Sequence, residues 1–312
     1  MNEINWAFFG TSSFSTLILD EMKKKGLVPT LIITTPDKPK GRKLVLTPPE
    51  AKVWADKENI PVLQLSSLKT DEAENKIMSH FPNGADLFVV ASYGKIIPQN
   101  ILDLPKHKTL NVHPSLLPKL RGPSPMISSI LEENETGVTI MRLDEEMDHG
   151  PIIAQQKIEI DWPPYALDLE KALGQLGGQM MAEAIPKWLN GELNEKEQDH
   201  QKATYCKKIT KEDGLLNLSE DAEINLRKIR AYHNWPGAYF FENRGHRTIR
   251  VIVKRAHVED GNLVIERVTP EGKKEMDYSS YLRGKEIKYE LLELFLANKT
   301  ALTQLQVSLH AI

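Results

Sequence analysis

Short apolar runs alternate with amphipathic segments along the first part of the chain. The predicted strands cover residues 4–9, 29–35, 61–65 and 86–91. The predicted helices between them cover residues 13–25, 49–58 and 71–81. The run at 86–91 is the most apolar, as is typical of a strand in the middle of a parallel sheet. This alternation predicts a doubly wound, mostly parallel α/β sheet with a Rossmann-like arrangement.

The pattern continues to about residue 189 and is then interrupted by a polar stretch. The next predicted elements are a helix at 119–133, a strand at 137–143, an acidic loop at 144–148, a strand at 151–160 and a helix at 166–189. Residues 190–206 are mostly polar and predict a linker. We therefore expect the first domain to span residues 1–189.

The rest of the chain has a different periodicity. A capped helix at 219–232 is followed by short alternating strands at 238–241, 247–253 and 262–268, with glycine-containing turns between them. Short strands at this spacing favour a small β-barrel of the OB-like type, a scaffold that often binds oligonucleotides. The second domain is expected to span residues 207–312. Its last segment, 287–312, is predicted helical and has no assigned role.

Composition and charge narrow the class of protein. The 312 residues carry a net charge of −3, so no global field draws the protein to nucleic acid. Residues 207–285 nevertheless have a balance of +4. The single cysteine, Cys206, excludes an internal disulfide, and no apolar run approaches the length of a membrane span. The first residues also lack a secretory leader pattern, so a cytoplasmic protein is expected.

A basic loop follows the second predicted strand. It contains Lys38, Lys40, Arg42 and Lys43 among prolines and a glycine. Such a loop is either a solvated surface feature or a contact for a polyanion such as RNA. The turn after the first strand has only Gly10 of the dinucleotide-binding glycine pattern, which argues against NAD.

Three polar side chains of different chemistry lie at or near predicted strand ends. Asn111 and His113 are two residues apart on a strand and therefore point to the same face, and Asp148 lies further along the chain, after the strand at 137–143. An amide and an imidazolium can stabilise an oxyanion, while a carboxylate orients the imidazole or accepts a proton. This set predicts acyl transfer.

Other chemistries remain open at this point. Ser115 lies close enough to His113 for an acyl-serine mechanism, although the sequence has no nucleophile elbow. A metal site built from His113, Asp148 and His149 matches no standard ligand spacing. Cys206, in the expected linker, is a poor candidate for a nucleophile.

Several motifs resemble a known family. Residues 111–118 with Arg121 and Gly122, the strand 137–141 and residues 147–151 resemble the catalytic region of the formyltransferases that use 10-formyltetrahydrofolate. Features that resemble the members acting on methionyl-tRNA are Gly10, Thr11 and Phe14, the loop 35–42, the junction 235–238, and the barrel segments 269–276 and 281–284. The sequence after Gly284 departs from the family pattern.

The resemblance implies a reaction and a set of site residues. It implies transfer of the formyl group of 10-formyltetrahydrofolate to the α-amino group of methionyl initiator tRNA, in translation initiation. Asn111 and His113 would hold the formyl oxygen, and Asp148 would orient the groups or relay a proton. The side chains implied at the folate are Ser115, Leu116, Leu117 and Pro118. The backbone implied around the pterin belongs to Val89, Val90, Tyr93 and Gly94 and to residues 143–147.

The resemblance also bears on partners. Lys38, Lys40, Arg42 and Lys43 would meet the acceptor arm of the tRNA. No metal is implied, and a monomer is expected. Three alternatives remain: a sugar-nucleotide N-formyltransferase, a formyltetrahydrofolate hydrolase in which water replaces the amine, and a non-catalytic RNA-binding protein.

Overall fold

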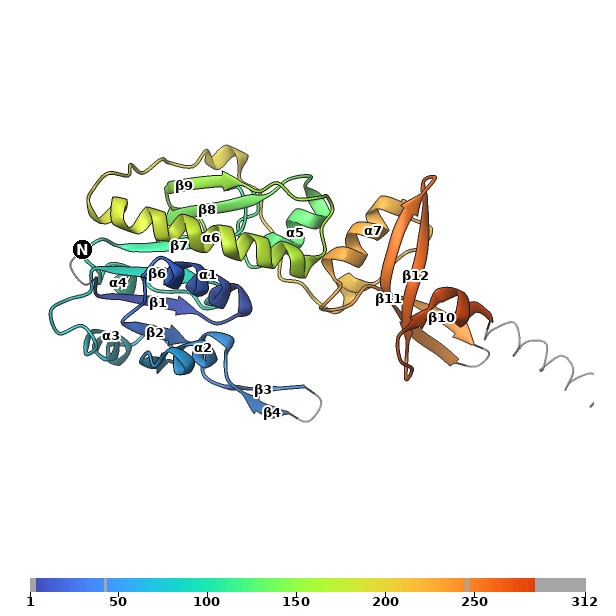
Figure 1. The fold of residues 1–312 in the computed structure, drawn as a ribbon, viewed down its shortest axis with the longest axis horizontal. Helices are drawn as coiled ribbons and strands as arrows, with labels where there is room; N and C mark the ends of the chain where they lie inside the picture. Colours follow the sequence, from blue (N-terminus) through green and yellow to red (C-terminus); the bar gives the residue numbers. More distant parts are fainter. Residues whose placement is uncertain (1–3, 42–43, 245–246, 284–312) are drawn as a thin grey trace, which may run out of the picture. The chain divides into compact units, whose positions relative to one another are not determined.

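The chain folds into two compact units, Met1–Ile209 and Thr210–Ile312. The computed structural model describes residues 4–41, 44–244 and 247–283 (Figure 1). The expected helix at 287–312 therefore lies outside the described residues. No helix in the described ranges is both long and apolar enough to cross a lipid bilayer.

A seven-stranded sheet forms the centre of the first unit. Its strand order is β5-β2-β1-β6-β7-β8-β9. The strands are β1 Trp6–Gly10, β2 Leu31–Thr34, β5 Val62–Gln64, β6 Leu87–Ala91, β7 Thr109–His113, β8 Gly137–Arg142 and β9 Ile152–Lys157. The strands from β5 to β7 pair in parallel, whereas β8 and β9 pair antiparallel. This confirms the expected doubly wound, mostly parallel sheet.

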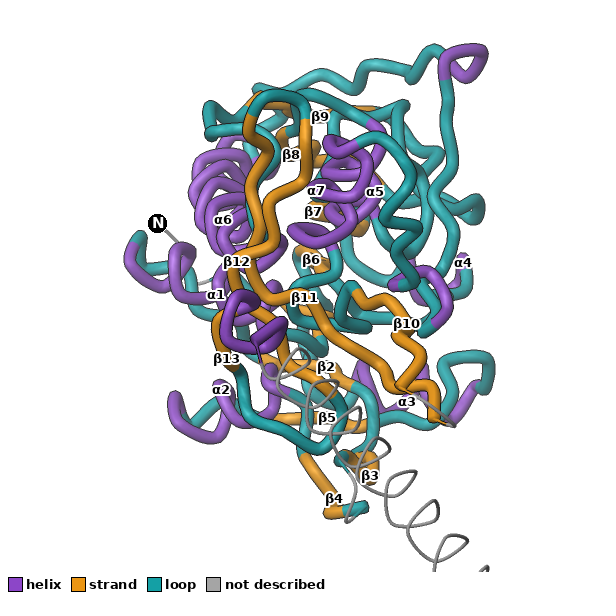
Figure 2. The backbone as a smooth tube through the Cα atoms, turned by 90° about the vertical axis from the view of Figure 1, so that its right-hand side faces the viewer, coloured by secondary structure: helices purple, strands orange, loops and turns teal. Residues whose placement is uncertain are grey.

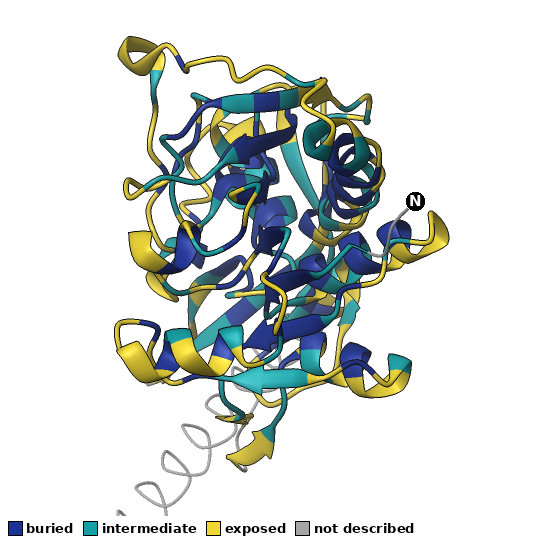
Figure 3. Ribbon diagram, turned by 90° about the vertical axis from the view of Figure 1, so that its left-hand side faces the viewer, coloured by how far each residue is buried: buried dark blue, intermediate teal, exposed yellow. Residues whose placement is uncertain are grey.

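Helices cover both faces of this sheet. They are α1 Ser13–Lys24, α2 Glu50–Glu58, α3 Asp71–Met78, α4 Gln99–Leu102, α5 Pro125–Glu132 and α6 Ala166–Leu189. On one face, Ile77 of α3 and Ile101 of α4 share a core with Phe9 and Phe88. On the other face, Gly177 of α6 lies against Val112 of β7. The central strands are therefore buried on both sides, as Figure 3 shows in dark blue.

Close packing of α1 against α6 depends on glycine. A Cβ atom at Gly178 would lie 2.7 Å from the backbone oxygen of Ile18, and one at Gly174 would lie 2.7 Å from Cβ of Leu17. Figure 1 shows the two helices side by side. The absent side chains let the helix axes approach closely enough to cover the β6–β8 side of the sheet.

Two segments differ from the sequence-based expectation. The helix predicted at 119–133 begins only at Pro125, because Leu120 and Gly122 adopt positive φ angles of 60° and 118° that no α-helix contains. Residues 190–206, expected as a linker, lie within the first unit. The backbone of Lys196 exchanges hydrogen bonds of 2.8 and 2.9 Å with Ile152 of β9, and a short 3₁₀ turn covers His200–Lys202.

The basic segment after β2 forms a hairpin rather than an irregular loop. Strands β3 Lys38–Lys40 and β4 Val45–Thr47 pair antiparallel. At its base, the Asp37 carboxylate accepts hydrogen bonds from Lys52 at 3.0 Å and from Gln64 at 2.7 Å. The hairpin is thus fixed to α2 and β5 through three side chains.

The second unit contains the antiparallel sheet. Its elements are η2 Glu212–Gly214, α7 Ala222–Ala231, β10 Tyr239–Arg244, β11 Arg247–Glu259, β12 Asn262–Pro270 and β13 Met276–Asp277. The strands follow the order β10-β11-β12-β13, and Figure 2 shows β11 and β12 as a long hairpin. Val251, Val268 and Tyr281 form its core. Within residues 210–244 and 247–283, the part expected as a small β-barrel forms a four-stranded antiparallel sheet.

Candidate active site

Strand β7 places the amide and the imidazole side by side. Asn111 and His113 are buried, with 8% and 4% of their surface exposed, and they pair in register with Met141 and Thr139 of β8. Both residues come at the carboxyl end of a central parallel strand, where α/β sheets bind ligands. The two side chains thus share one face and one edge of the sheet.

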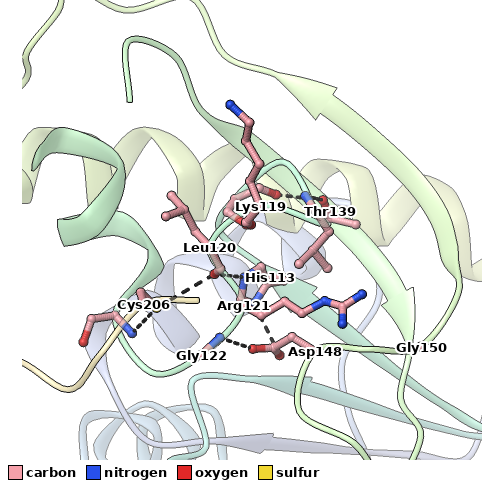
Figure 4. A network of polar contacts seen from close by, with 12 residues as sticks. His113, Lys119, Leu120, Arg121, Gly122, Thr139, Asp148, Gly150 and Cys206 are labelled. Carbon is pink, nitrogen blue, oxygen red and sulfur yellow. Dashed lines mark hydrogen bonds and ion pairs between the residues drawn. The ribbon is translucent and has the colours of Figure 1, made fainter. Parts of the chain in front are cut away.

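Both nitrogens of the His113 ring face oxygen acceptors. Nε2 lies 3.1 Å from the carbonyl oxygen of Leu120, and Nδ1 lies 3.5 Å from Oδ1 of Asp148 (Figure 4). A neutral imidazole has one N–H, whereas an imidazolium has two. Only the imidazolium form could donate to both oxygens at once.

Both the backbone and the side chain of Asp148 are constrained. Its φ of 51° is left-handed, and its Oδ2 accepts a 2.8 Å hydrogen bond from the backbone N–H of Gly122. Burial raises the pKa of the Asp148 carboxyl, but the charge and hydrogen bond of His113, the Gly122 N–H and the charge of Arg121 together outweigh it. The net pKa is lowered, so the carboxylate is ionised at neutral pH.

The Asn111 side chain is available to a ligand. No residue in the described part of the chain hydrogen-bonds to its amide group. In contrast to the Tyr93 hydroxyl, the amide atoms of Asn111 are not sealed from solvent, so a ligand can reach them. Asn111, His113 and Asp148 together thus offer an unused N–H donor and an imidazole beside a fixed, ionised carboxylate.

The turn after β7 is fixed by residues that the sequence did not indicate. The Thr139 hydroxyl donates to the Ser115 carbonyl at 2.7 Å and accepts from the backbone N–H of Leu117 at 3.2 Å. The Gln155 amide donates to the carbonyl of Leu117 at 2.9 Å. No motif identifies Thr139 or Gln155, because their role depends on the pairing of β8 and β9 with β7.

Ser115 has a structural partner. Its hydroxyl donates a 2.7 Å hydrogen bond to the carbonyl of Lys119, whereas the nitrogens of His113 face Leu120 and Asp148. A serine nucleophile needs a base within hydrogen-bond reach. The acyl-serine alternative therefore has no support in this geometry.

The structure also bears on Cys206 as a nucleophile and on the alternative of a metal site. The Cys206 thiol is buried, which raises its pKa, and its sulfur accepts a 3.2 Å hydrogen bond from the Ser124 N–H. A protonated, buried thiol is a poor nucleophile. No group of three or more histidine, cysteine, aspartate or glutamate side chains within 4–41, 44–244 and 247–283 is arranged as a metal site.

The residues expected at the folate fall into two groups. Leu116, Leu117 and Pro118 line an open cavity of about 220 Å³, together with Thr136 and Gln155. The second group is on and after β6, where Val89 and Val90 are buried and Val90 pairs with Asn111. Gly94, with a φ of 74°, turns the chain beyond the strand.

Tyr93 in the second group is nearly inaccessible. Its ring lies edge-on to that of Phe9, with centroids 5.4 Å apart. Burial raises the pKa of Tyr93 to about 12, and its hydroxyl has no partner in the described part of the chain. The phenol therefore remains protonated at all physiological pH values.

Two of the four expected tRNA contacts, Lys38 and Lys40, lie on the hairpin. Lys38 and Lys40 are exposed on β3, and Lys40 is 3.4 Å from Glu50. Arg42 and Lys43 lie outside the described residues. The apolar side chains of Leu44, Val45 and Leu46 follow them and are 59–72% exposed. The hairpin thus presents cationic and apolar side chains together.

Comparisons with known proteins show the family. The family model described as formyl transferase matches residues 4–185, and that described as formyl transferase, C-terminal domain, matches residues 208–262. A methionyl-tRNA formyltransferase of Thermotoga neapolitana is 46% identical over 239 residues, which cover 76% of this chain and 75% of the relative. One of Bacillus licheniformis is 35% identical over 301 residues, covering 89% and 94%.

Solved structures with low sequence identity share the fold. A methionyl-tRNA formyltransferase from Clostridium thermocellum has a TM-score of 0.58 at 17% identity, covering 86% of this chain and 99% of its own. A 4-N formyltransferase from Francisella tularensis has a TM-score of 0.60 at 19% identity, covering 81% and 99%. The shared fold is thus compatible with different formyl acceptors.

Proposed function

This chain belongs to the formyl transferase family, and we infer from that membership that it transfers the formyl group of 10-formyltetrahydrofolate to the α-amino group of methionyl initiator tRNA. The reaction supplies the formylated initiator for protein synthesis. The observation that carries this function is identity of 35% to a methionyl-tRNA formyltransferase across both units, rather than across the catalytic unit alone.

In the mechanism that we propose, the free amine of the methionyl group attacks the formyl carbon. A C–N bond forms, and the carbonyl electrons move to oxygen to give a tetrahedral oxyanion. The Asn111 amide N–H and the positive charge of His113 stabilise this oxyanion. The C–N10 bond then breaks, N10 takes up a proton, and tetrahydrofolate leaves.

We assign Asp148 an orienting and electrostatic role. A carboxylate whose pKa is lowered is a weak base at neutral pH, so it is poorly suited to remove the proton of the attacking amine. Its Oδ1 lies 3.5 Å from Nδ1 of His113, which suits the carboxylate to orient the ring. The amine's proton then leaves through water.

The co-substrates are placed by the remaining expected residues. The folate contacts that we propose are Ser115, Leu116, Leu117 and Pro118, together with Val89, Val90, Tyr93 and Gly94. The tRNA contacts that we propose are Lys38, Lys40, Arg42 and Lys43. Residues 207–285, which have a charge balance of +4, would hold a further part of the tRNA. We propose a cytoplasmic monomer that needs no metal, because hydrogen-bond donors carry the developing charge.

The experiment that tests the function is transfer of labelled formyl from 10-formyltetrahydrofolate. The acceptors are charged initiator tRNA, charged elongator tRNA and an amino-sugar nucleotide, assayed in parallel. We expect transfer confined to the initiator. Formyl found only on the sugar would favour a sugar N-formyltransferase, and release of formate without transfer would favour a hydrolase. Absence of folate binding would favour a non-catalytic RNA-binding protein.

A further inference from the structure

A buried glutamine in the segment 196–206 connects an arginine to the backbone around Asp148. The Gln198 side chain is 5% exposed. Its Oε1 accepts hydrogen bonds from Nε and Nη2 of Arg121 at 3.2 and 2.7 Å. Its Nε2 donates to the carbonyl oxygens of Asp148 and Gly150 at 3.0 and 2.7 Å.

We propose that Gln198, held by Arg121, is a positioning residue that fixes Asp148 for formyl transfer. Gln198 touches no reacting group in this arrangement, and it acts through the backbone on both sides of His149. This inference rests on the proposed function, because it assumes that Asp148 supports His113 during catalysis.

The chemistry of the amide permits only one orientation. The Arg121 guanidinium carries donors only, so it must face Oε1, and the two backbone carbonyls are acceptors only, so they must face Nε2. Both ends of the Gln198 amide are then paired. A carboxylate in its place would still pair with Arg121, but it would set an oxygen against the two carbonyls, with no proton between them.

Arg121 and Gly122 hold Asp148 from a second direction. The N–H of Arg121 donates to Thr204 at 2.9 Å, and its carbonyl accepts from Cys206 at 2.8 Å. Gly122, the next residue, donates to Oδ2 of Asp148. A Cβ atom at Gly122 would lie 2.6 Å from the Cys206 carbonyl oxygen, so only glycine fits there.

The two attachments fix different parts of Asp148. The Gln198 amide donates to the backbone carbonyl of Asp148, a residue in the left-handed conformation with a φ of 51°. The Gly122 N–H donates to the Asp148 carboxylate. A left-handed conformation is unfavourable for aspartate and persists where surrounding contacts impose it. Removal of the Gln198 amide would therefore allow the backbone to relax and move the carboxylate away from Nδ1 of His113.

Two histidines lie on the outer side of this network. Nδ1 of His200 is 2.9 Å from Nη2 of Arg121, and the His200 ring stacks on His149 with centroids 4.1 Å apart. Nδ1 of His149 is in turn 2.8 Å from Asp144. Because Arg121 can only donate, His200 accepts at Nδ1. The stacked rings form a further contact between the segment around His200 and the loop that carries Asp148.

The test uses Gln198→Glu in the full chain, assayed by formyl transfer to charged initiator tRNA. Glutamate keeps the partner of Arg121 and removes both donors to the Asp148 loop. We expect kcat to fall about 10²-fold through misplacement of the carboxylate. We expect KM for the folate and for the tRNA to change little. The thermal midpoint should fall, because the buried carboxylate faces two carbonyl oxygens, so kcat is measured well below the midpoint of the variant. Gln201→Glu, the same change at an exposed position three residues along, should leave kcat unchanged.

A double-mutant cycle separates positioning from general damage. If Gln198 acts through Asp148, adding Gln198→Glu to Asp148→Asn should lower kcat by no more than about twofold further. Two independent, additive losses would overturn the proposal, and so would wild-type kcat in Gln198→Glu. Should Gln198→Glu fail to fold, Arg121→Lys, which keeps the charge and removes the fork to Gln198, should give the same non-additivity. An inactive wild-type chain would instead contradict the proposed function.

Discussion

At the scale of single residues, Asp148 has a proposed role in catalysis and a predicted contribution to stability. Its pKa is lowered in the folded state, so ionised Asp148 stabilises the fold above the pKa of an unfolded aspartate, about 3.9. This stabilisation is lost as the pH falls through the lower, folded-state value. We predict that wild type exceeds Asp148→Asn in free energy of unfolding at pH 7, and that the difference shrinks progressively below about pH 4.

Urea unfolding at several pH values checks this prediction. Asp56→Asn serves as the control, because Asp56 is exposed on α2 and the same loss of charge should have little effect there. A difference between wild type and Asp148→Asn that stays constant from pH 7 to pH 3 would contradict the assigned charge state.

Asn111 and His113 give a second prediction at this scale. Replacing either residue by alanine should lower kcat about 10²–10³-fold, because each removes one stabilising group from the oxyanion. The far-ultraviolet circular dichroism spectrum should not change. The measurement is single-turnover transfer of labelled formyl, and near-normal rates in either variant would rule out the assigned role.

At the scale of elements, the β3–β4 hairpin carries a prediction about tRNA binding. Replacing Lys38 and Lys40 by alanine should weaken binding and reduce the slope of log K against log salt by about 0.7–0.9 for each phosphate that is no longer neutralised. Folate affinity should not change, since the hairpin is fixed separately by Asp37, Lys52 and Gln64. Lys57→Ala on α2 is the matched control. An unchanged slope in the hairpin variant would indicate a solvated surface feature.

The packing of α1 on α6 carries a prediction about stability. Gly178→Ala would place a methyl group against the backbone of Ile18, which cannot move without the helix, and should cost about 1–3 kcal/mol. Gly174→Ala would place a methyl group 2.7 Å from Cβ of Leu17, an atom that a rotamer change does not move, and should also be destabilising, although alanine itself favours the helix by about 1 kcal/mol. Urea unfolding should therefore show both variants to be less stable than the wild type. Wild-type stability in either variant would contradict this account of the packing.

At the scale of the whole molecule, the two units are predicted to contribute to the binding of different substrates. We predict that residues 1–209 expressed alone fold and bind the folate with the affinity of the full chain, because the sheet and the three site residues lie within that unit. Their KM for charged initiator tRNA should rise strongly, since the second unit would no longer hold its part of the tRNA. Filter binding and steady-state kinetics on both forms provide the measurement. An unchanged KM for the tRNA would exclude a binding role for the second unit.

The sequence by itself determined the fold class of this protein and predicted the chemistry of its candidate site. Apolar runs such as 86–91 report burial on both faces of a sheet, and helix 166–189 agrees with α6 to the residue. Asn111 and His113 follow from their spacing on one strand. Such patterns are local, and they reflect the strand period of two and the helix period of 3.6 residues.

Only the tertiary structure decided which distant segments support the site. Arg121 and Gln198 are 77 positions apart, and the polar segment that contains Gln198 has no periodicity that distinguishes it from a linker. The left-handed residues at Leu120 and Asp148 likewise have no local signature, because surrounding hydrogen bonds impose them. Contacts between remote segments depend on chain topology, and the periodicity of a single segment carries no record of them.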